Sequence, residues 1–575
     1  MKVVFILCSF LCISFNSHAQ FHDNHWLLGY AGGEISEPDD SFGISILSFY
    51  EGDLTIENNQ SIDLEFDGAG NSFSDFAGNL LLFSNGLEIR NRDDVQLING
   101  DFNGSFGDPE SIITQSFVFL PHSEDLLDIS FVRMLYTEDL PRLGGDVEHF
   151  RINPYFEDNG LLYDGTRLSV LDSLATGELT ACRHANGRDW WLLLSKANQQ
   201  MIYTVLISPT EFEVRDSIEM DFPLYNGLGQ SLFSPDGNRY IRVNLIGGIN
   251  GDDYLDVFDF DRCTGMVSNQ RQINIGANAS AGGAAISPSS RYLYVSHYNH
   301  IYQYDLLAAD ISETKDTVAT YDGYLEWNFF HSRFFQAQLA PDGKIYLNSP
   351  SGVKVLSVIN QPDEAGTDVD VVQHSIPLPN NNAFTLANHP NYRLGPVDGS
   401  VCDTLGIDNL PRAYYRIDRN PEDTLNFHFQ DLSFYEPTSW LWTFGDGASS
   451  VERHPDHTYQ NSGIYEVCLT ASNDLGSDTH CRTLELGPVA VDDLQQLTFS
   501  TFPNPVQDVL VLDLGQYYPL NGQFRLHNAA GQLVFSKQVL YRQTRMQFAK
   551  LPAGVYFYEF WDDGMKLGQG KVLKH

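Results

Sequence analysis

The sequence contains three His-x-x-His pairs, a spacing that lets two imidazoles hold one metal ion when both lie on one face of a helix. In a strand, residues three apart point to opposite faces of the sheet, so the same spacing cannot chelate. Each pair lies in a stretch that we expect to be strand or turn, and we predict no metal site. The pairs are His22 with His25, His297 with His300, and His454 with His457.

An acidic segment raises the question of calcium. Residues 252–261 alternate Asp with apolar residues, but they lack the Gly-centred spacing of an EF-hand loop. We interpret the segment as a strand with a solvated acidic face. Asp446 lies in a Gly-Asp-Gly turn, where we expect a structural role rather than a ligand role. The sequence thus predicts no cofactor, with calcium as the open alternative.

Two Arg and His pairs are candidate ligand contacts. Arg183 and His184 precede one turn of a recurring hairpin, and His331 and Arg333 precede another. Their side chains could line the mouth of a propeller or hydrogen-bond between neighbouring blades, and both interpretations stay open.

Sequence motifs of common enzymes are missing. The chain has no G-x-S-x-G elbow, no H-E-x-x-H motif and no Walker loop. This favours a non-enzymatic function, and we predict no catalytic residue. A secreted hydrolase or lyase acting on polysaccharide is the alternative.

The elements that would position these residues repeat along the chain. Residues 233–243 read as a strand, a tight turn and a second strand. Pro235 presets φ for the turn, and Asp236-Gly237 supplies a residue that tolerates positive φ. Related turns centred near residues 78, 124, 187, 237, 290 and 343 recur every 46–63 residues.

This period is at or just above the length of a propeller blade, about 40–50 residues. We therefore predict an all-β chain that begins with a β-propeller over residues 20–395. Strands at 26–29 and 43–50, together with 384–386 from the other end, would form a closing blade. The prediction is about seven blades, with six as the alternative.

Composition limits the class of partner. The chain has 575 residues, 13% of them aromatic, and a formal net charge of −41. Binding to nucleic acid depends on Lys and Arg that neutralise phosphates, so this charge argues against it. An anionic membrane is a poor partner for the same reason. Like charge suits a soluble exported protein.

The first residues resemble a secretory signal. Lys2 precedes an apolar run over residues 3–13, and Ala19 ends a small-x-small cleavage site. We predict a signal peptide at 1–19 and a secreted or cell-surface location. No later run reaches the ~20 apolar residues of a transmembrane helix.

A different pattern follows a predicted linker at 396–411. The motif W-x-F-G-D-G is followed by H-x-Y at 457–459 and G-x-Y-x-V at 463–467. In this order and spacing they resemble a PKD domain, a small Ig-like β-sandwich, over residues 412–487. The first motif consists of Trp442, Phe444, Gly445, Asp446 and Gly447.

Five cysteines follow the signal peptide. Cys468 and Cys481 flank a predicted hairpin turn, which would place them on neighbouring antiparallel strands, so we predict a disulfide. An odd number implies at least one thiol that is free or pairs elsewhere. The states of Cys182, Cys263 and Cys402 stay open.

After a second predicted linker at 488–497, residues 498–575 resemble the C-terminal sorting domain of the type IX secretion system of Bacteroidetes. The resemblance implies a small β-sandwich, recognition by the translocon and its sortase, and removal of the domain. It leaves open whether the protein is released or attached to lipopolysaccharide. The matching residues are Pro503, Asn504, Pro505, Gly531, Gly554, Tyr556 and Lys571.

Residues 1–395 resemble the propeller-like ectodomains that precede PKD domains in Bacteroidetes surface proteins, on the motifs at 183–187 and 391–395. No ligand follows from this likeness. The prediction is an exported surface protein that binds a glycan or protein ligand. The alternatives are the polysaccharide enzyme and a purely structural surface component.

Overall fold

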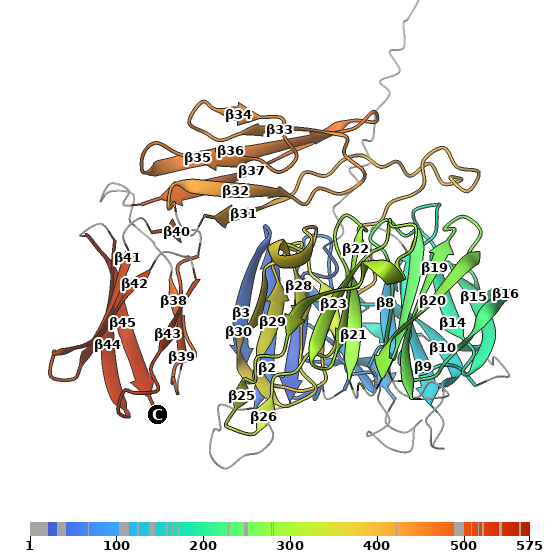
Figure 1. Cartoon of the computed structure of the whole chain (residues 1–575), viewed down its shortest axis with the longest axis horizontal. Coiled ribbons are helices and arrows are strands. Elements are labelled where there is room, and N and C mark those ends of the chain that lie inside the picture. The colour runs from blue at the N-terminus through green and yellow to red at the C-terminus, as the bar shows by residue number, and fades with distance from the viewer. Residues whose placement is uncertain are drawn as a thin grey trace, which may run out of the picture.

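The computed structural model is an all-β chain in three parts (Figure 1). They are a propeller-like unit, a sandwich above it and a C-terminal sandwich beside it. The predicted signal peptide and the second predicted linker lie outside the described residues. The structure describes residues 21–30, 42–66, 68–102, 114–122, 126–136, 144–156, 159–163, 165–168, 173–227, 229–245, 251–277, 279, 281–420, 423–487, 499–507, 509–515, 517–519, 522–539, 543–562 and 565–575.

Seven antiparallel groups of strands make up the described propeller-like unit. The first three are β1 (His25–Tyr30), β2 (Gly43–Tyr50) and β3 (Asp53–Asn59); β4 (Asn71–Ser74), β5 (Leu80–Ser84), β6 (Glu88–Asn91) and β7 (Gln96–Asp101); and β8 (Phe117–Pro121), β9 (Ile129–Tyr136) and β10 (Gly144–Asn153), with β11 (Leu161–Leu162) and β12 (Thr166–Leu168). A parallel bridge between β11 and β7 joins the second group to the third.

The next four groups have four strands each. They are β13 (Ala181–Arg183), β14 (Trp190–Ser195), β15 (Gln199–Ile207) and β16 (Phe212–Leu224); β17 (Gln230–Phe233), β18 (Arg239–Asn244), β19 (Asp252–Phe260) and β20 (Val267–Ala277); β21 (Gly282–Ile286), β22 (Tyr292–His297), β23 (His300–Asp305) and β24 (Asp316–Thr320); and β27 (Ala337–Leu339), β28 (Ile345–Leu347), β29 (Val353–Ile359) and β30 (Val371–Asn382). Between the last two lies a separate hairpin, β25 (Leu325–Glu326) and β26 (Phe330–His331). The described 3-10 turns are η2 (Ser312–Thr314) and η3 (Gly366–Val369).

Hydrophobic cores between successive groups close the ring. Each core takes residues from two or three neighbouring groups, as expected for strands buried on both faces. The closing core joins the first group to the last, where Trp26 and Leu28 of β1 pack with Tyr346 and Leu356. This arrangement agrees with the propeller prediction and with seven blades.

The recurring turns all serve the same connection. The turns at Gly78, Gly187, Gly237, Ser290 and Gly343 each join the first strand of a group to its second. All five residues have positive φ, the conformation that the Pro-Asp-Gly chemistry predicts. The sixth predicted turn, near residue 124, lies outside the described residues. We call the end of the ring that carries these turns the turn face.

The predicted closing strand is placed differently from expectation. Residues 384–386 were expected to add a strand to the N-terminal group, but Ala387 instead bridges Gly70 in parallel, just before β4. The free edge of β1 is already used, because the Phe66 amide donates to Gly29 O and the Ser72 hydroxyl donates to His25 O. Side-chain packing, rather than a shared sheet, therefore closes the ring.

The middle sandwich has two sheets over one core. Trp442 and Phe444 fill this core, as predicted. The strands are β31 (Tyr415–Arg419), β32 (Asn426–Asp431) and β35 (Asp456–Thr458) in one sheet, and β33 (Ser439–Thr443), β34 (Ser449–Ser450), β36 (Gly463–Ser472) and β37 (Ser477–Leu486) in the other.

The C-terminal sandwich is built in the same way around a separate core. Its β40 (Tyr517–Tyr518) pairs in parallel with β37 and so joins the two sandwiches. The other strands are β38 (Ser500–Phe502), β39 (Val509–Asp513) and β43 (Gln543–Gln547), facing β41 (Gly522–Asn528), β42 (Leu533–Val539), β44 (Gly554–Asp562) and β45 (Met565–Lys574).

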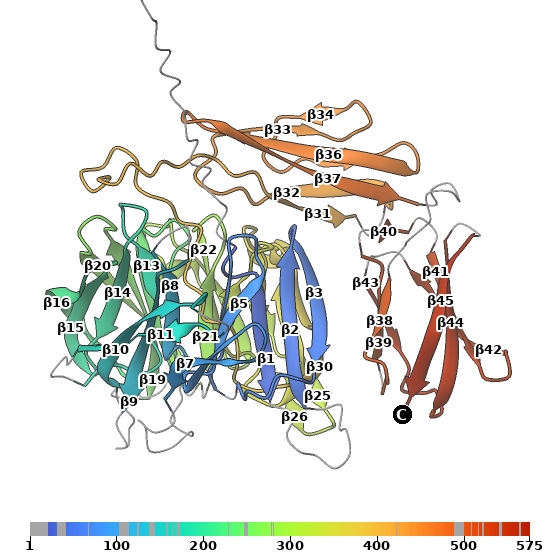
Figure 2. The same ribbon diagram turned by 180° about the vertical axis from the view of Figure 1, so that it is seen from behind.

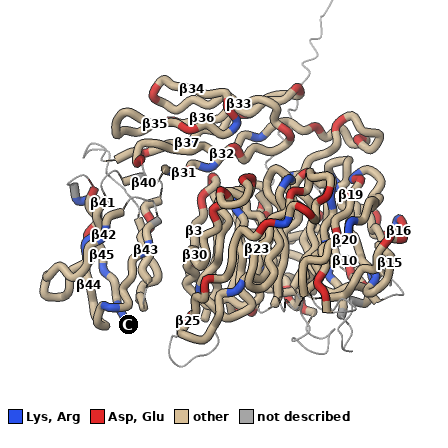
Figure 3. The backbone as a smooth tube through the Cα atoms, in the orientation of Figure 1, with Lys and Arg blue, Asp and Glu red and all other residues tan. Residues whose placement is uncertain are grey.

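The middle sandwich lies across the turn face, and both views show it there (Figures 1 and 2). Two buried arginines make the connection. Arg482 of β37 pairs with Asp53 at 2.6 Å, and Arg416 of β31 donates to Asp342 O. Figure 3 shows acidic and basic positions interspersed along both the ring and the sandwich. The sandwich is therefore fixed to the ring by charge-assisted hydrogen bonds.

Two disulfides are present among the described cysteines. Cys468 pairs with Cys481 across β36 and β37, as predicted. Cys263 pairs with Cys402 over a separation of 139 residues and ties the predicted first linker to the ring. Cys182 is a buried free thiol. The described residues contain no helix that is long and apolar enough to span a membrane.

Candidate ligand-binding cavity

Arg183 is a buried structural cation. Its guanidinium lies 4.1 Å from the centre of the Trp190 ring and donates to the carbonyls of Gly187 and Tyr392. Burial lowers its pKa to about 10. Neighbouring His184 accepts a hydrogen bond from the Asn186 amide within the turn. These side-chain contacts lie within the pair's own turn and on the segment after β30, rather than between neighbouring blades.

His331 and Arg333 lie elsewhere. His331 is exposed on β26, where its Nδ1 is 3.2 Å from the Tyr321 hydroxyl. The Arg333 guanidinium lies 4.4 Å from the centre of the Tyr298 ring. Because β26 is at the end of the ring opposite the turn face (Figure 1), the structure does not bring the two Arg and His pairs together.

Amide side chains join the inner strands around the ring axis. Gln230 donates to Ala337 O and accepts from the Ala284 amide, which links β17 to β27 and β21. The Gln115 side-chain amide donates to the Ser231 carbonyl and accepts from the Ser231 backbone N–H. Small residues and blade-to-blade hydrogen bonds therefore occupy the centre of the ring.

The segment after β30 crosses this centre. Asn388 donates to Phe117 O and Leu179 O, and its own carbonyl accepts from Asn71. Further along, the Tyr392 hydroxyl donates to Phe119 O. We call residues 383–395 the plug segment, because they cross the centre of the ring and hydrogen-bond to several of its groups of strands.

A buried charge cluster lies between two groups of strands. Arg242 donates to Glu178 at 2.7 and 2.6 Å and to Asp256 at 3.2 Å. Burial raises the pKa of both carboxyls, and the nearby Arg242 opposes this. All three side chains are shielded from solvent. The cluster has two carboxylates and a cation, as a catalytic site could, but it has no access for a substrate.

This cluster corrects the interpretation of residues 252–261. Asp256 was expected on a solvated face of β19, but it is buried because Arg242 of β18 lies opposite it. Asp253 is also buried and pairs with His297 at 2.9 Å. Among the described residues, no group of three or more His, Cys, Asp or Glu side chains could hold a metal ion.

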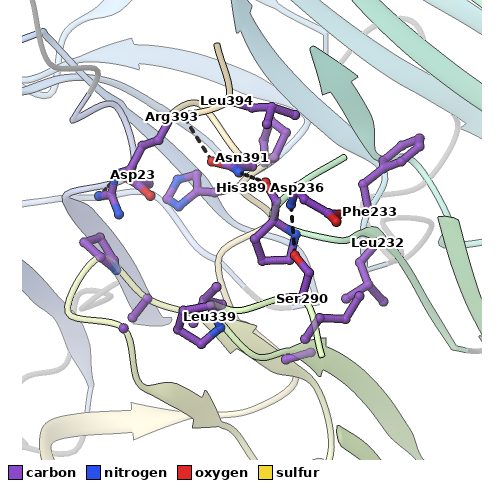
Figure 4. A pocket seen from close by; sticks show the side chains of 18 of the residues that line it. Asp23, Leu232, Phe233, Asp236, Ser290, Leu339, His389, Asn391, Arg393 and Leu394 are labelled. Atoms are coloured by element: carbon purple, nitrogen blue, oxygen red, sulfur yellow. Dashed lines mark hydrogen bonds and ion pairs between the residues drawn. The ribbon is translucent and has the colours of Figure 1, made fainter. Parts of the chain in front are cut away.

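A cavity of about 490 Å³ lies between the turn face and the middle sandwich (Figure 4). Its walls come from inner strand ends, from the plug segment and from the loop after β32. The apolar part includes Leu232, Phe233, Leu339, Leu394 and Leu432. A cavity of this size at a junction between domains is a common ligand site.

Polar groups stand at several points of this wall. Arg393 pairs with Asp23 at 2.7 Å, and Asn391 donates to Pro235 O. His389 is buried behind them, and burial lowers its pKa. Figure 4 shows Asp23 and Arg393 on the side opposite Leu232 and Phe233. The cavity thus offers both apolar and charged groups to a ligand.

Sequence reasoning missed both the cavity and the buried cluster. The cavity depends on how two domains dock, and no periodicity encodes that. The cluster left a signal, since Arg242 lies within the run Tyr240, Ile241 and Val243 at the centre of β18. A charged residue in such a strand needs a buried partner, and this rule alone would have pointed to Arg242.

The W-x-F-G-D-G motif of the middle sandwich makes contacts that stabilise its own turn. Asp446 accepts from the Ala448 amide and lies 2.8 Å from His457 Nε2. The His457 ring stacks on Phe444 with centroids 4.1 Å apart. Gly445 has φ of +82°, and an added Cβ would lie 2.7 Å from Glu466 N. These contacts fold the turn onto the core.

Two of the C-terminal motifs meet at the β45 edge of the sandwich. Asn504 donates to Lys571 O and accepts from the Leu573 amide, both at 2.9 Å, so the P-N-P segment fixes β45. The Tyr556 hydroxyl donates to Pro552 O. Gly531 has positive φ in the turn before β42.

Two family models match parts of the chain. The PKD domain model matches residues 412–487, and the secretion system C-terminal sorting domain model matches residues 500–573. The chain therefore carries a PKD domain and a type IX sorting domain. The sorting domain indicates export to the cell surface or into the medium.

Similar proteins cover little of the chain. The pre-pro-metalloprotease PrtV of Vibrio cholerae is 45% identical over 49 residues, which is 8% of this chain and 5% of PrtV. Collagenase ColQ1 of Bacillus cereus is 42% identical over 45 residues, again 8% and 5%. The chain thus spans about a twentieth of these curated relatives.

The chain is also similar to solved structures, two of which follow. The PKD1 domain of Vibrio cholerae PrtV is 34% identical and covers 13% of this chain and 95% of that one, with a TM-score of 0.12. PorZ, a surface component of the type IX secretion system of Porphyromonas gingivalis, is 10% identical. It covers 93% of this chain and 74% of its own, with a TM-score of 0.30.

Proposed function

We propose that this protein is a non-enzymatic binding or adhesion module of a Bacteroidetes cell surface, with a glycan or protein as ligand. Residues 1–19 direct it out of the cytoplasm. The type IX translocon and its sortase then act on residues 498–575. The surface location comes from the sorting domain, and the binding role is the proposal.

The cavity between the propeller-like unit and the PKD domain carries this proposal. Its volume of about 490 Å³ falls within the range of ligand sites. Leu232 and Phe233 lie on one side of the cavity and the Arg393–Asp23 pair on the other, so it offers both apolar and charged contacts to a ligand.

The docking of the PKD domain supports a defined cavity. Arg482 and Arg416 are both buried at the junction, and Tyr414 accepts a hydrogen bond from the Gly52 amide. An added Cβ at Gly52 would lie 2.9 Å from the Arg416 backbone, so the two parts approach closely. A domain held in this way acts as a fixed wall rather than a loose spacer.

The inner ring favours binding over catalysis. Hydrogen bonds of the Gln115 and Gln230 side chains and the plug segment cross the ring axis, and Gln115, Gln230 and Asn388 also line the cavity. The Glu178–Arg242–Asp256 cluster has its charges paired and its access closed. Both observations support a scaffold whose contacts with ligands lie at its ends.

A binding screen tests the proposal. Residues 20–487 would be screened on a glycan array, by capture of surface proteins and for hydrolysis of polysaccharides. We expect a ligand that Leu339→Trp excludes by filling the cavity, while Val451→Trp on the exposed side of the PKD domain still binds. Turnover of a polysaccharide would favour the enzyme, and binding unaffected by Leu339→Trp would move the site elsewhere.

A secretion experiment tests the export route separately. Deletion of residues 498–575 should trap the protein in the periplasm. Continued display on the cell surface would contradict a role for these residues in sorting, whatever the ligand is.

A further inference from the structure

The β25–β26 hairpin is an insertion that belongs to none of the seven groups of strands. It lies between β24 and β27 and forms a two-stranded sheet of its own. It projects at the end of the ring opposite the PKD domain (Figure 1). The hairpin is therefore separate from the cavity described above.

The tip of this hairpin exposes aromatic rings. Trp327 is 44% exposed and Phe329 is 63% exposed. The Phe330 ring lies 6.1 Å from Trp327 and 4.4 Å from Phe329, measured between centroids, so the three rings form one cluster. Single exposed apolar residues are ordinary, but a cluster of rings on a loop tip indicates a contact surface.

The backbone holds the cluster in an unfavourable conformation. Trp327 has φ of +48° and Asn328 has φ of +65°. Asn tolerates this region, whereas a bulky side chain does so at a cost of about 1 kcal/mol or more. Such outliers persist where the surroundings fix them, and they gather at functional sites.

The base of the hairpin provides that support. The Tyr324 ring stacks on His374 of β30 with centroids 4.3 Å apart and an interplanar angle of 15°. His374 Nε2 in turn lies 2.7 Å from Asp322 Oδ2. The Tyr321 hydroxyl donates to Tyr324 O. A fixed platform loses little entropy when a ligand binds.

The chemistry of the tip selects the ligand. A flat exposed aromatic ring can stack on the apolar C–H face of a sugar ring. Around them, the Glu326 carboxylate can accept hydrogen bonds from hydroxyls, and His331 is exposed nearby. The net charge of −41 disfavours an acidic polymer and an anionic lipid surface.

From these observations we infer that the β25–β26 hairpin is a binding site for an uncharged polysaccharide. Trp327 and Phe329 provide the stacking surface, and Glu326 and His331 provide polar contacts at its edge. The site goes beyond the proposed function, since it is distinct from the cavity and holds whether or not the cavity binds a ligand.

Affinity electrophoresis of the full chain tests this site. The gels contain hydroxyethylcellulose, laminarin, galactomannan or starch, with polygalacturonate as the acidic comparison. We expect a neutral polysaccharide to retard the protein, and Trp327→Ala or Phe329→Ala to weaken binding about tenfold. Trp327→Tyr, which keeps a ring, should retain binding. The matched control is Phe222→Ala, because Phe222 is 45% exposed on β16, outside the hairpin.

Several outcomes would overturn the inference. They are no retardation by any neutral polysaccharide, equal retardation of Trp327→Ala and the parent, or stronger retardation by polygalacturonate. Binding to neutral phosphatidylcholine vesicles that the same variants abolish would make the hairpin a lipid contact instead. Loss of polysaccharide binding in Leu339→Trp, with the hairpin intact, would place the glycan in the cavity.

Discussion

The two ends of the propeller-like ring differ in what covers them. At the turn face, buried arginines attach the PKD domain, and a disulfide attaches residues 396–411, which precede it. At the opposite end, the β25–β26 hairpin presents rings to solvent. At one end the PKD domain covers the turns and encloses the cavity, whereas at the other end the hairpin is exposed to solvent.

This difference follows from the repeat. The short turns of the turn face share one geometry, with Gly or Ser290 at positive φ, and so give a docking domain a regular surface. The connections at the other end carry no such pattern and can hold insertions. Binding residues are expected on variable connections supported by a rigid scaffold. Variants that weaken the contacts at the turn face, or that change the hairpin at the opposite end, test this difference.

Removal of the Cys263–Cys402 disulfide should have the largest effect on stability. The bond closes a loop of 139 residues between the ring and the segment that leads to the PKD domain. Replacing both cysteines by Ser should lower the free energy of unfolding by about 4 kcal/mol, because the unfolded chain gains the most freedom from a long loop. Urea unfolding followed by fluorescence measures it.

The matched control is the Cys468–Cys481 pair, which closes only 13 residues within one sandwich. Its double Ser variant should cost about 3 kcal/mol. A larger cost for the short loop than for the long one would contradict the view that the long tie holds the turn face together.

Loss of Arg482 should rank next. Its side chain is 2% exposed and pairs with Asp53 at 2.6 Å across the junction. Arg482→Ala leaves that carboxylate without its cation and should cost about 3 kcal/mol. Limited proteolysis should then cut residues 396–411 sooner. Arg412→Ala is the control, since Arg412 is 42% exposed and its nearest carboxylate oxygen is 3.6 Å away. Equal effects of the two variants would speak against a docked PKD domain.

The turn face should also weaken in acid, through His22. Its buried Nδ1 donates to Ser74 O, and burial lowers its pKa from 6.5 to about 3. Between these values the unfolded chain binds a proton that the native chain does not, so stability falls as pH falls. From pH 7 to pH 5 the loss is about 2 kcal/mol. Urea unfolding of His22→Gln at both values should show a smaller loss, and an unchanged loss would contradict the assignment.

Much of the architecture could be predicted from local chemistry. The turn at Pro235, Asp236 and Gly237 specifies its own geometry, and it recurs at a blade-like period. Trp442 and Phe444 alternate along a strand and so identify a core. Cys468 and Cys481 lie on strands joined by one short turn, which fixes their pairing.

The sites could not be predicted in the same way, because they depend on contacts between distant segments. Cys402 reaches Cys263 only after residues 396–411 fold back over the ring. The cavity appears only once Leu432 of the PKD domain faces Leu232 of an inner strand. Trp327 follows no turn pattern, since a bulky residue with positive φ is what turn chemistry predicts against.

Trp327→Gly should change stability least, and it gives the sharpest test of the end of the ring opposite the PKD domain. Glycine adopts a φ of +48° without steric cost, which offsets part of the packing lost with a ring that is 44% exposed, so the free energy of unfolding should change by less than about 1 kcal/mol. Polysaccharide binding should nevertheless be lost, because the stacking surface is gone. Thermal unfolding and affinity electrophoresis of the same preparation separate the two effects. A loss of more than about 1 kcal/mol would mean that the ring packs as part of the scaffold, and the two ends of the molecule would then not differ in the way proposed.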